Sequence, residues 1–583
     1  FTLAIGSFGP TVAPTTNAKV NYTLIPLGTF QAGTSVRVGT CGILDASFAA
    51  NTYLRLFIAG TDNEVAVNDE SCAGHGSQIN YVAPYDMSLE LHAGCAGESV
   101  GCAGTVALST RRDATPRPAN VKAAFSRVVD HGVLGVSPDI NTLIRGINYQ
   151  GDGWGEKYHH QGIARTYNRS RYDFAWSTSV NQYGAPQYNN VFFTKIGSRP
   201  STSLRERFGG WGLGTAYDAV VFGSNAGVYD GSDPGDDGDY DGVPVGRRFD
   251  HGGGMQAIGN YVAVTSEFVS LPCTPSPYLP DCPEHRDRNL PPSGQASQVL
   301  LYDISQPSPQ PKLLVSRRGK SSGWVAVAKL GESQAPPVLR NGYLMMVPNG
   351  DELDLYAIQA DPCTGYASLS QLKANLATEA MGPAGPSLDP LAPPTCPGVR
   401  TPSQQSSADK RQIWHVGCVK RVEQYWNPES DPDCPNLVSM YEDGERHDFP
   451  AQADVQSGTF VTQANGRLFL LAFEGQQVEY GPNSEVQLWR VVFGAASGAA
   501  PSLRAMPDDS ECETFLCLVR AGTESAHNSY KNMHVDGING AMFRFGGSGY
   551  IVPSANPAEE TFFIYGTEHY LQQTPRAALF NEF

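Results

Sequence analysis

The clearest candidates for chemistry are the aspartates of a short glycine-rich segment at positions 230–242. Asp237, Asp239 and Asp241 alternate along it and are followed by Gly242, which matches the first half of a D-x-D-x-D-G calcium loop. Alternate carboxylates can converge on one cation, and the glycine permits the sharp turn that such a loop needs. The spacing therefore predicts a bound calcium ion.

The second half of this loop departs from the calcium-binding pattern. Arg248 occupies the place where an EF-hand has its bidentate glutamate, so Asp233 or Asp250 would have to complete the coordination shell. The alternative is a solvated loop without metal, kept extended by repulsion between its carboxylates. If calcium binds, we expect its role to be structural and not catalytic.

Several histidines precede or begin segments that we expect to form the innermost strands of a repeated sheet. Such strands would aim these side chains at a common axis, where imidazoles could share a transition metal such as iron or copper. The alternative is that each histidine is structural and links neighbouring sheets through backbone carbonyls. The four candidates for metal ligands are His160, His251, His447 and His534.

The chain has 12 cysteines, which fall into close sequential couples with Gly, Pro and Ser between them. This pattern predicts six local disulfides. Zinc binding is the alternative, but the sequence has no C-x2-C motif and no Cys/His run with zinc spacing. The expected pairs are Cys41 with Cys72, Cys95 with Cys102, Cys273 with Cys282, Cys363 with Cys396, Cys418 with Cys434, and Cys512 with Cys517. Disulfides, and a chain that begins with Phe instead of Met, predict a secreted protein whose signal peptide has been removed.

Length and charge exclude several classes of protein. A chain of 583 residues is long enough for two to four domains. It carries 41 Lys and Arg against 58 Asp and Glu, a net charge of −17, which opposes binding to DNA or RNA. No segment approaches the roughly 18 consecutive apolar residues of a transmembrane helix. We therefore expect no nucleic-acid partner and no membrane span.

The first 110 residues contain short segments in which apolar and polar residues alternate, each bounded by Gly, Asn or Pro. Period-two alternation with closely spaced turns predicts a β-sandwich. The segments are residues 35–39, 52–57, 65–67, 78–82 and 88–92.

Five stretches of this region resemble the bacterial pre-peptidase C-terminal domain, a small jelly-roll-like accessory module of secreted proteins. They are residues 53–57, 68–72, 77–81, 93–95 and 101–107. The resemblance implies an adhesive or accessory role, and some members of the family bind calcium through acidic loops. Asn68, Asp69 and Glu70 are the residues that would do so here, with a solvated turn as the alternative.

The segment Ser109–Asn120 is charged, contains prolines and lacks an apolar period, as an exposed interdomain linker requires. We therefore predict a sandwich domain at residues 1–110, a linker at residues 111–121 and a second domain at residues 122–583. The second domain carries most of the predicted disulfides and the acidic loop.

The second domain repeats one pattern of an apolar strand, a tight Asn-Gly or Gly-Asn turn, a second strand, a loop and a third strand. Sheets repeated in this way bury both faces only by stacking around an axis, which predicts a β-propeller of five blades, with six as the alternative. The fold class is therefore all-β, a jelly-roll-like sandwich followed by a propeller. The copies span residues 163–196, 255–304, 324–358, 459–491 and 541–565.

We expect a secreted, non-catalytic protein that binds or assembles something outside the cell. Its partner would be a surface glycan, an envelope component or further copies of itself. One alternative is a secreted propeller enzyme, either a hydrolase with axial carboxylates or an oxidase with histidine-bound metal. The other is a subunit of an extracellular filament or matrix. Aromatic residues at 183–188 and 425–426 could stack on sugar rings or anchor loops.

Overall fold

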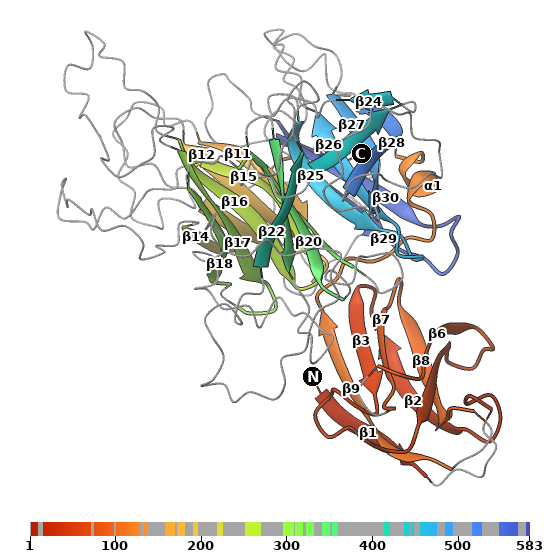
Figure 1. Ribbon diagram of the computed structural model, residues 1–583. Coiled ribbons are helices and arrows are strands. Elements are labelled where there is room, and N and C mark those ends of the chain that lie inside the picture. The colour runs from red at the N-terminus through yellow and green to blue at the C-terminus, as the bar shows by residue number, and fades with distance from the viewer. Residues whose placement is uncertain are drawn as a thin grey trace, which may run out of the picture.

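The computed structural model of the chain is built almost entirely from β-strands, which confirms the all-β prediction. Figure 1 shows a smaller region formed by the first strands and a larger one formed by the later strands. The one helix among the described residues, α1 (Val121–Phe125), is short and lies beside the larger region (Figure 1). Among the described residues, no helix is long and apolar enough to cross a membrane. The structure describes residues 2–9, 16–71, 75–97, 101–128, 133–136, 158–168, 172–180, 190–195, 219–225, 251–269, 295–307, 309–318, 322–330, 341–349, 352–358, 413–419, 437–442, 445–447, 455–474, 484–493, 516–526, 547–568 and 579–582.

The first nine strands form two antiparallel sheets that share one hydrophobic core. Leu54 and Leu56 of one sheet and Val36 and Val38 of the other are buried in this core. One sheet has the order β1 (Thr2–Phe8), β9 (Ala103–Arg112), β3 (Thr34–Gly39) and β7 (Gln78–Val82), with β4 (Ser47–Ala49) also paired to β9. The other has the order β2 (Thr23–Phe30), β8 (Met87–Cys95), β5 (Thr52–Ile58) and β6 (Glu64–Asn68). All five segments predicted from alternation lie in these strands.

The second region contains further sheets, and most of their strand pairs are antiparallel. One sheet is β11 (Tyr158–Arg165), β12 (Phe174–Val180), β13 (Asn190–Lys195) and β14 (Ala219–Asn225). The next is β15 (His251–Ile258), β16 (Tyr261–Val269), β17 (Gln295–Asp303) and β18 (Pro311–Arg318). The largest runs β19 (Ala326–Lys329), β20 (Tyr343–Asn349), β21 (Glu352–Ile358), β22 (Ile413–Val419), β23 (Leu437–Glu442), β28 (Leu516–Ala526), β27 (Ser484–Phe493), β26 (Leu468–Glu474) and β25 (Val455–Thr462), with β24 (Glu445–His447) on β23. The last is β10 (Val133–Val136), β31 (Leu579–Glu582), β30 (Thr561–Glu568) and β29 (Gly547–Val552).

Five strands meet in the middle of the second region. They are β11, β15, β19, β25 and β29, and we call them the first strands. β11 contacts β15 and β29, β19 contacts β15 and β25, and β25 contacts β29. Gln256 of β15 is buried there, and its side-chain oxygen accepts hydrogen bonds from the backbone N–H of Val327 at 2.8 Å and of Phe460 at 3.0 Å. One side chain thus links three of the five first strands.

Glycines allow these strands to approach closely. A Cβ atom at Gly254 would lie 2.8 Å from Cβ of Trp324, and one at Gly458 would lie 2.4 Å from the indole ring of the same residue. Trp324 is fully buried. The described first strands are therefore packed directly against one another around Trp324, and no larger residue fits at either glycine.

The repeat pattern predicted most of the strands in this region. In the copy at residues 255–304, a turn at Gly259 and Asn260 joins β15 to β16, as the sequence indicates. In the copy at residues 541–565, β29 and β30 are adjacent strands of one sheet. Residues 541–546 of this copy lie outside the described part. β31 and then β10, from far earlier in the chain, complete that sheet. The sequence pattern gave no sign of this pairing.

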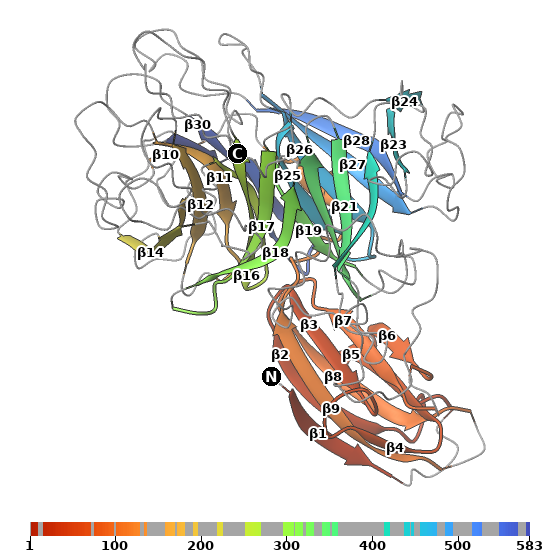
Figure 2. The ribbon, with the colours of Figure 1, turned by 60° about the vertical axis from the view of Figure 1, so that its left-hand side comes forward.

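Much of the segment predicted as an exposed linker is instead buried, so the expected exposure is wrong for residues 113–118, whereas Ala119 and Asn120 are exposed. Residues 113–118 are all buried where the two regions meet (Figure 2). Asp113 lies 3.1 Å from Nζ of Lys329 and accepts a hydrogen bond from the Ser35 hydroxyl. The backbone carbonyl of Arg112 accepts a 2.7 Å hydrogen bond from the N–H of Asn260. Charged and proline residues serve here to attach the sandwich to the second region.

Candidate functional site

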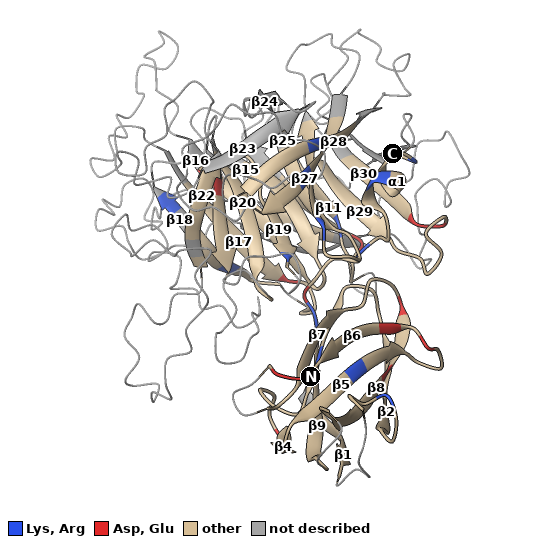
Figure 3. Cartoon of the chain, turned by 45° about the vertical axis from the view of Figure 1, so that its right-hand side comes forward, with Lys and Arg blue, Asp and Glu red and all other residues tan. Residues whose placement is uncertain are grey.

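The outer face of the β2–β8–β5–β6 sheet presents a mixed row of side chains to solvent. Strand pairing aligns Leu24 with His92, His92 with Arg55, and Arg55 with Val67 across the four strands. Their neighbours along the strands, such as Leu91, face the core. Because side chains alternate between faces, the row lies on the face opposite the core. Figure 3 shows charged stretches on β5 and β6.

Three rings form a stack on this face. The His92 ring lies 3.8 Å from that of Tyr22 with planes 8° apart, and 4.2 Å from that of Phe57 with planes 29° apart. β8 lies between β2 and β5, so the two aromatic rings approach His92 from opposite sides. His92 is buried by its neighbours, whereas Tyr22 remains 37% exposed. Tyr22 is therefore the outer member of the stack.

Charged groups surround the stack. Arg55 forms an ion pair with Glu64, and its Nε donates a 2.7 Å hydrogen bond to the backbone carbonyl of Asn17. Glu90 lies 3.4 Å from Nε2 of His92, and its other oxygen accepts a 3.0 Å hydrogen bond from the backbone N–H of Gly60. These side chains are held in place by fixed partners, so the face presents a pre-arranged set of donors and acceptors.

Large apolar side chains that are exposed to solvent gather around the same strands. Val20, Tyr22, Leu24 and Val67 are among the few such residues in the described part of the chain. An exposed aromatic ring beside charged hydrogen-bonding groups can contact the apolar face of a sugar ring while those groups bond its hydroxyls. This combination makes the face our candidate binding site.

Burial lowers the pKa of the His92 imidazole below its usual value of 6.5. Arg55 acts in the same direction, whereas the hydrogen bond and the charge of Glu90, and the charge of Glu64, oppose it. Burial dominates because both faces of the ring are covered by aromatic rings. At neutral pH the ring is therefore uncharged, and it behaves as part of an aromatic stack.

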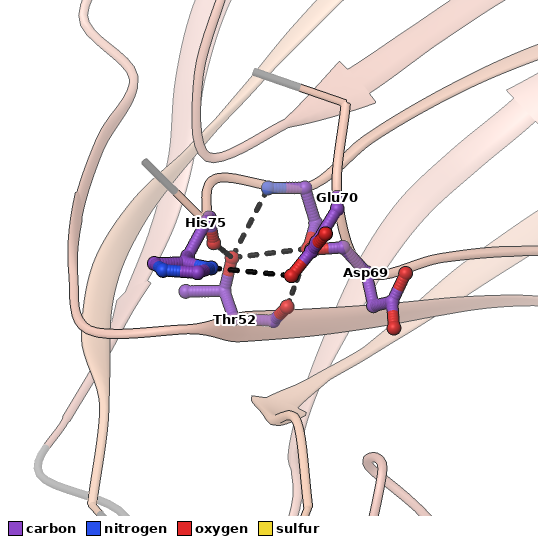
Figure 4. A network of polar contacts seen from close by, with 5 residues as sticks. Thr52, Asp69, Glu70 and His75 are labelled. Atoms are coloured by element: carbon purple, nitrogen blue, oxygen red, sulfur yellow. Dashed lines mark hydrogen bonds and ion pairs between the residues drawn. The ribbon is translucent and has the colours of Figure 1, made fainter. Parts of the chain in front are cut away.

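The structure describes the predicted calcium residues Asn68, Asp69 and Glu70 and gives two of their side chains other partners. The Asn68 side-chain oxygen accepts a 3.0 Å hydrogen bond from the N–H of Gln78, and Glu70 pairs with His75 at 3.2 Å. In Figure 4 the Asp69 carboxylate points away from that pair. Across the described part of the chain, no group of three or more His, Cys, Asp or Glu residues is arranged to hold a metal. Calcium binding by these residues stays a prediction.

The other predicted metal ligands are described only in part. The aspartates at 233, 237, 239, 241 and 250 lie outside the described residues, as does His534. His160 and His251 lie on β11 and β15, two neighbouring first strands. His447 lies on β24, which pairs with β23 and is not one of the first strands. The strands thus place two of the four histidines near the middle of the second region.

One predicted disulfide is confirmed. Cys95 and Cys102 are bonded, with their Cα atoms 5.5 Å apart. Cys41, Cys418 and Cys517 are also disulfide-bonded, each to a cysteine outside the described residues. Their pairings stay predictions, as do the two pairs that lie wholly outside the described part, Cys273 with Cys282 and Cys363 with Cys396. The aromatic residues at 183–188 and 425–426 lie outside it as well.

A second polar cluster lies between the sheets of β18 and β21, and sequence reasoning missed it. Arg317 and Asp354 are fully buried and form an ion pair, and Arg317 also donates to the Tyr356 hydroxyl at 3.1 Å and to the Pro348 carbonyl at 2.9 Å. Nε2 of His415 lies 3.1 Å from the other oxygen of Asp354. Burial raises the pKa of the Tyr356 hydroxyl far above its usual range. The cluster joins two sheets and leaves little of its polar surface to a ligand.

Sequence reasoning also missed the outer-face stack. The strands at residues 52–57 and 88–92 were predicted, and their alternation already places an aromatic and charged set on one side. What the sequence could not supply is the pairing of β2 with β8, which brings Tyr22 onto His92. An exposed, mixed face on predicted strands was the available signal.

Comparison with known proteins assigns no family. No protein-family model and no curated protein sequence matches this chain. A glycoside hydrolase family 32 structure from Bifidobacterium adolescentis is similar at 9% identity and a TM-score of 0.26, covering 94% of this chain and 73% of that one. The parainfluenza virus 5 hemagglutinin-neuraminidase ectodomain is similar at 8% identity and 0.26, covering 78% and 72%. A DUF4623 family protein from Bacteroides eggerthii is similar at 10% identity and 0.25, covering 91% and 97%. At these TM-scores the similarities establish neither fold family nor function.

Proposed function

We propose that this is a secreted, non-catalytic binding protein that holds a neutral surface glycan on the outer face of the β2–β8–β5–β6 sheet. The observation that carries the proposal is the exposed Tyr22 ring, which is backed by His92 and lies near Arg55, Glu64 and Glu90. A sugar ring could stack on Tyr22 while its hydroxyls bond the charged groups. The ring is already held by His92, so little conformational entropy is lost on binding.

Charge favours a neutral glycan over an acidic one. The face carries two carboxylates, Glu64 and Glu90, against one guanidinium, Arg55, and the whole chain has a net charge of −17. An acidic polysaccharide would meet repulsion both locally and at long range. A neutral sugar meets none, and it can accept from Arg55 and donate to either carboxylate.

Depletion of the protein from solution by insoluble polysaccharides tests this proposal. We expect binding to at least one of curdlan, cellulose and mannan, and none to alginate beads. Tyr22→Ala should weaken it about fivefold, since a stacking contact contributes roughly 1 kcal/mol. Leu44→Ala, which alters an exposed apolar residue in the loop before β4, is the matched control and should bind like the wild type. Equal binding by Tyr22→Ala and wild type would refute the assigned face.

The secreted location is supported by the state of the cysteines. All five that the structure describes, at 41, 95, 102, 418 and 517, are in disulfides. Disulfides persist in oxidising compartments and are rare in the cytosol. The resemblance of the sandwich to the pre-peptidase C-terminal domain, a module of secreted proteins, is consistent with this location.

We further propose that the second region is a five-bladed propeller. Support comes from the five first strands β11, β15, β19, β25 and β29, whose contacts include a closed series from β11 through β15, β19, β25 and β29 back to β11; β15 also contacts β25 and β29. Pairing of β10 with β31 would then join the beginning of the ring to its last blade. Electron microscopy of the full chain should reveal five sheets around one axis.

Structural calcium in the segment at residues 230–250 remains part of the proposal. If calcium is bound there, chelation should lower the unfolding temperature, because a ligand that binds only the folded state stabilises it by mass action. The measurement is a thermal scan with and without EDTA, and addition of excess calcium should restore the original value. An unchanged scan, together with no calcium in the purified protein, would remove this assignment.

A further inference from the structure

The stack on the outer face has one member that is exposed, Tyr22, and one that can ionise, His92. Tyr22 immediately precedes β2 and is 37% exposed, so one side of its ring is open to solvent. His92 lies in the middle of β8 and is covered by Tyr22 on one side and Phe57 on the other. If Tyr22 moves away, water reaches His92. The hydration and the protonation state of His92 are therefore coupled to the position of Tyr22.

We propose that His92 is an acid-responsive group under Tyr22, so that uptake of a proton by His92 displaces Tyr22 and releases the bound glycan. The release step rests on the proposed function, whereas the displacement of Tyr22 does not depend on any ligand. The surface thus binds the glycan at neutral pH and releases it in mild acid.

The charged groups around His92 favour its protonated form less than burial disfavours it. Glu90, on the same strand, lies 3.4 Å from Nε2 but also accepts a hydrogen bond from the Gly60 N–H. Glu64, from β6, is engaged with Arg55, from β5, and the Arg55 charge opposes a second positive charge nearby. From β2, the residue paired with His92 is the apolar Leu24. Among the described residues, Oε1 of Glu90 is thus the one carboxylate oxygen that faces the imidazole, and it offsets the cost of burying a charged ring only in part.

Burial therefore has the largest effect on the pKa of His92, and the geometry explains why burial lowers that pKa. A charged imidazolium enclosed by two rings loses its hydration, and this cost disfavours the protonated state. The folded-state pKa of His92 is accordingly lowered. Displacement of Tyr22 restores hydration on one side. By linkage, if protonation favours displacement, then removal of Tyr22 must raise the pKa of His92.

Histidine titration by NMR tests this coupling without a ligand. The full chain is labelled at His Cε1, and the His92 resonance is assigned by its loss in His92→Phe. We expect a midpoint below 6.5 in the wild type, a midpoint closer to 6.5 in Tyr22→Ala, and no change in Leu44→Ala. A wild-type midpoint at or above 6.5, or one that Tyr22→Ala leaves unchanged, would overturn the proposal.

Depletion by curdlan, cellulose and mannan at pH 7.5 and pH 5.5 tests the release step. One coupled proton weakens binding by at most about tenfold for each pH unit below the His92 pKa. Wild type should bind more weakly at pH 5.5 than at pH 7.5, whereas His92→Phe, which cannot titrate, should bind equally at both pH values whatever its affinity at pH 7.5. Equal losses in both proteins would overturn the release step. Absence of binding to all three would refute the proposed function instead, while the NMR titration would still decide whether His92 and Tyr22 are coupled.

Discussion

His92 of the sandwich and His415 of the second region each lie beside a carboxylate and an aromatic ring. His92 is 3.4 Å from Glu90 and stacks on Tyr22, while His415 is 3.1 Å from Asp354 with its ring 5.2 Å from that of Tyr356. The difference lies in what holds the carboxylate. Asp354 is fully buried and bound to an arginine, whereas Glu90 is bound to a backbone N–H near the surface.

The comparison shows that similar groups serve different purposes in the two regions. The Asp354 cluster lies between two sheets, so its ions stabilise each other and fix the packing. The His92 cluster lies on an open face beneath the partly exposed Tyr22, and under our proposal its protonation state affects the bound glycan. The two histidines have neighbours of similar chemical type but of different burial, with Tyr356 buried and Tyr22 partly exposed.

Replacing Asp354 or Glu90 by alanine should give the largest difference in stability between the two clusters. Asp354→Ala leaves Arg317 buried without its ion-pair partner and should cost about 3–5 kcal/mol of stability. Glu90→Ala affects a group near the surface and should cost less than about 1 kcal/mol. Calorimetry of both variants measures the difference, with hydrogen exchange to locate it in the second region or the sandwich. Similar losses in the two variants would contradict the comparison.

A pair of glycine substitutions should show how tightly the second region is packed. Gly458→Ala places a Cβ 2.4 Å from the Trp324 ring and should cost about 1–3 kcal/mol through overpacking. Gly522→Ala, also within a strand, would bring its Cβ no closer than 3.8 Å to Phe125. This control should be neutral or slightly stabilising. Unfolding temperatures of both variants provide the test, and equal effects would argue against close packing at the centre.

Tyr22→Ala should change stability little even though it disables the proposed binding face. Loss of one stacked pair costs at most about 1.5 kcal/mol, and Tyr22 is already partly exposed. Thermal unfolding of the variant, compared with Leu44→Ala, measures this. A large loss of stability would make Tyr22 a structural residue of the sandwich and would weaken its assignment to binding.

The smallest expected effect is the dependence of sandwich stability on pH. Because the folded-state pKa of His92 is lowered, the unfolded chain binds more protons below pH 6.5, and stability should fall as the pH drops through that value. His92→Phe should remove this contribution while leaving stability at pH 8 nearly unchanged. Hydrogen exchange in β8 across this pH range is the measurement. An identical pH dependence in wild type and variant would exclude His92 as its source.

Local sequence patterns predicted the strands better than they predicted how strands combine. Alternation located β5 and β8, and a Gly-Asn turn located the hairpin of β15 and β16. The pairing of β10 with β31 joins residues more than four hundred positions apart in the chain, which no local pattern encodes. The site was missed for the same reason, because Tyr22 and His92 meet only through strand pairing.

The charged segment at residues 113–118 shows a second reason why the sequence did not predict the whole structure. Prolines and charges there indicated exposure, since an unpaired buried charge is unfavourable. The structure supplies partners from distant residues, with Lys329 beside Asp113, so the segment can be buried. Arg117 is buried as well, which lowers its pKa to about 10. Composition alone cannot anticipate partners contributed by another region.

The pairing of β10 with β31 also constrains how the chain acquires its structure. The last sheet of the second region needs Leu579–Glu582, so that region cannot be completed until these residues have left the ribosome. The sandwich needs only residues up to Arg112 and can fold first. The sandwich can therefore be folded while most of the second region is still being synthesised. The last sheet of that region forms only when its final strand, β31, has been added.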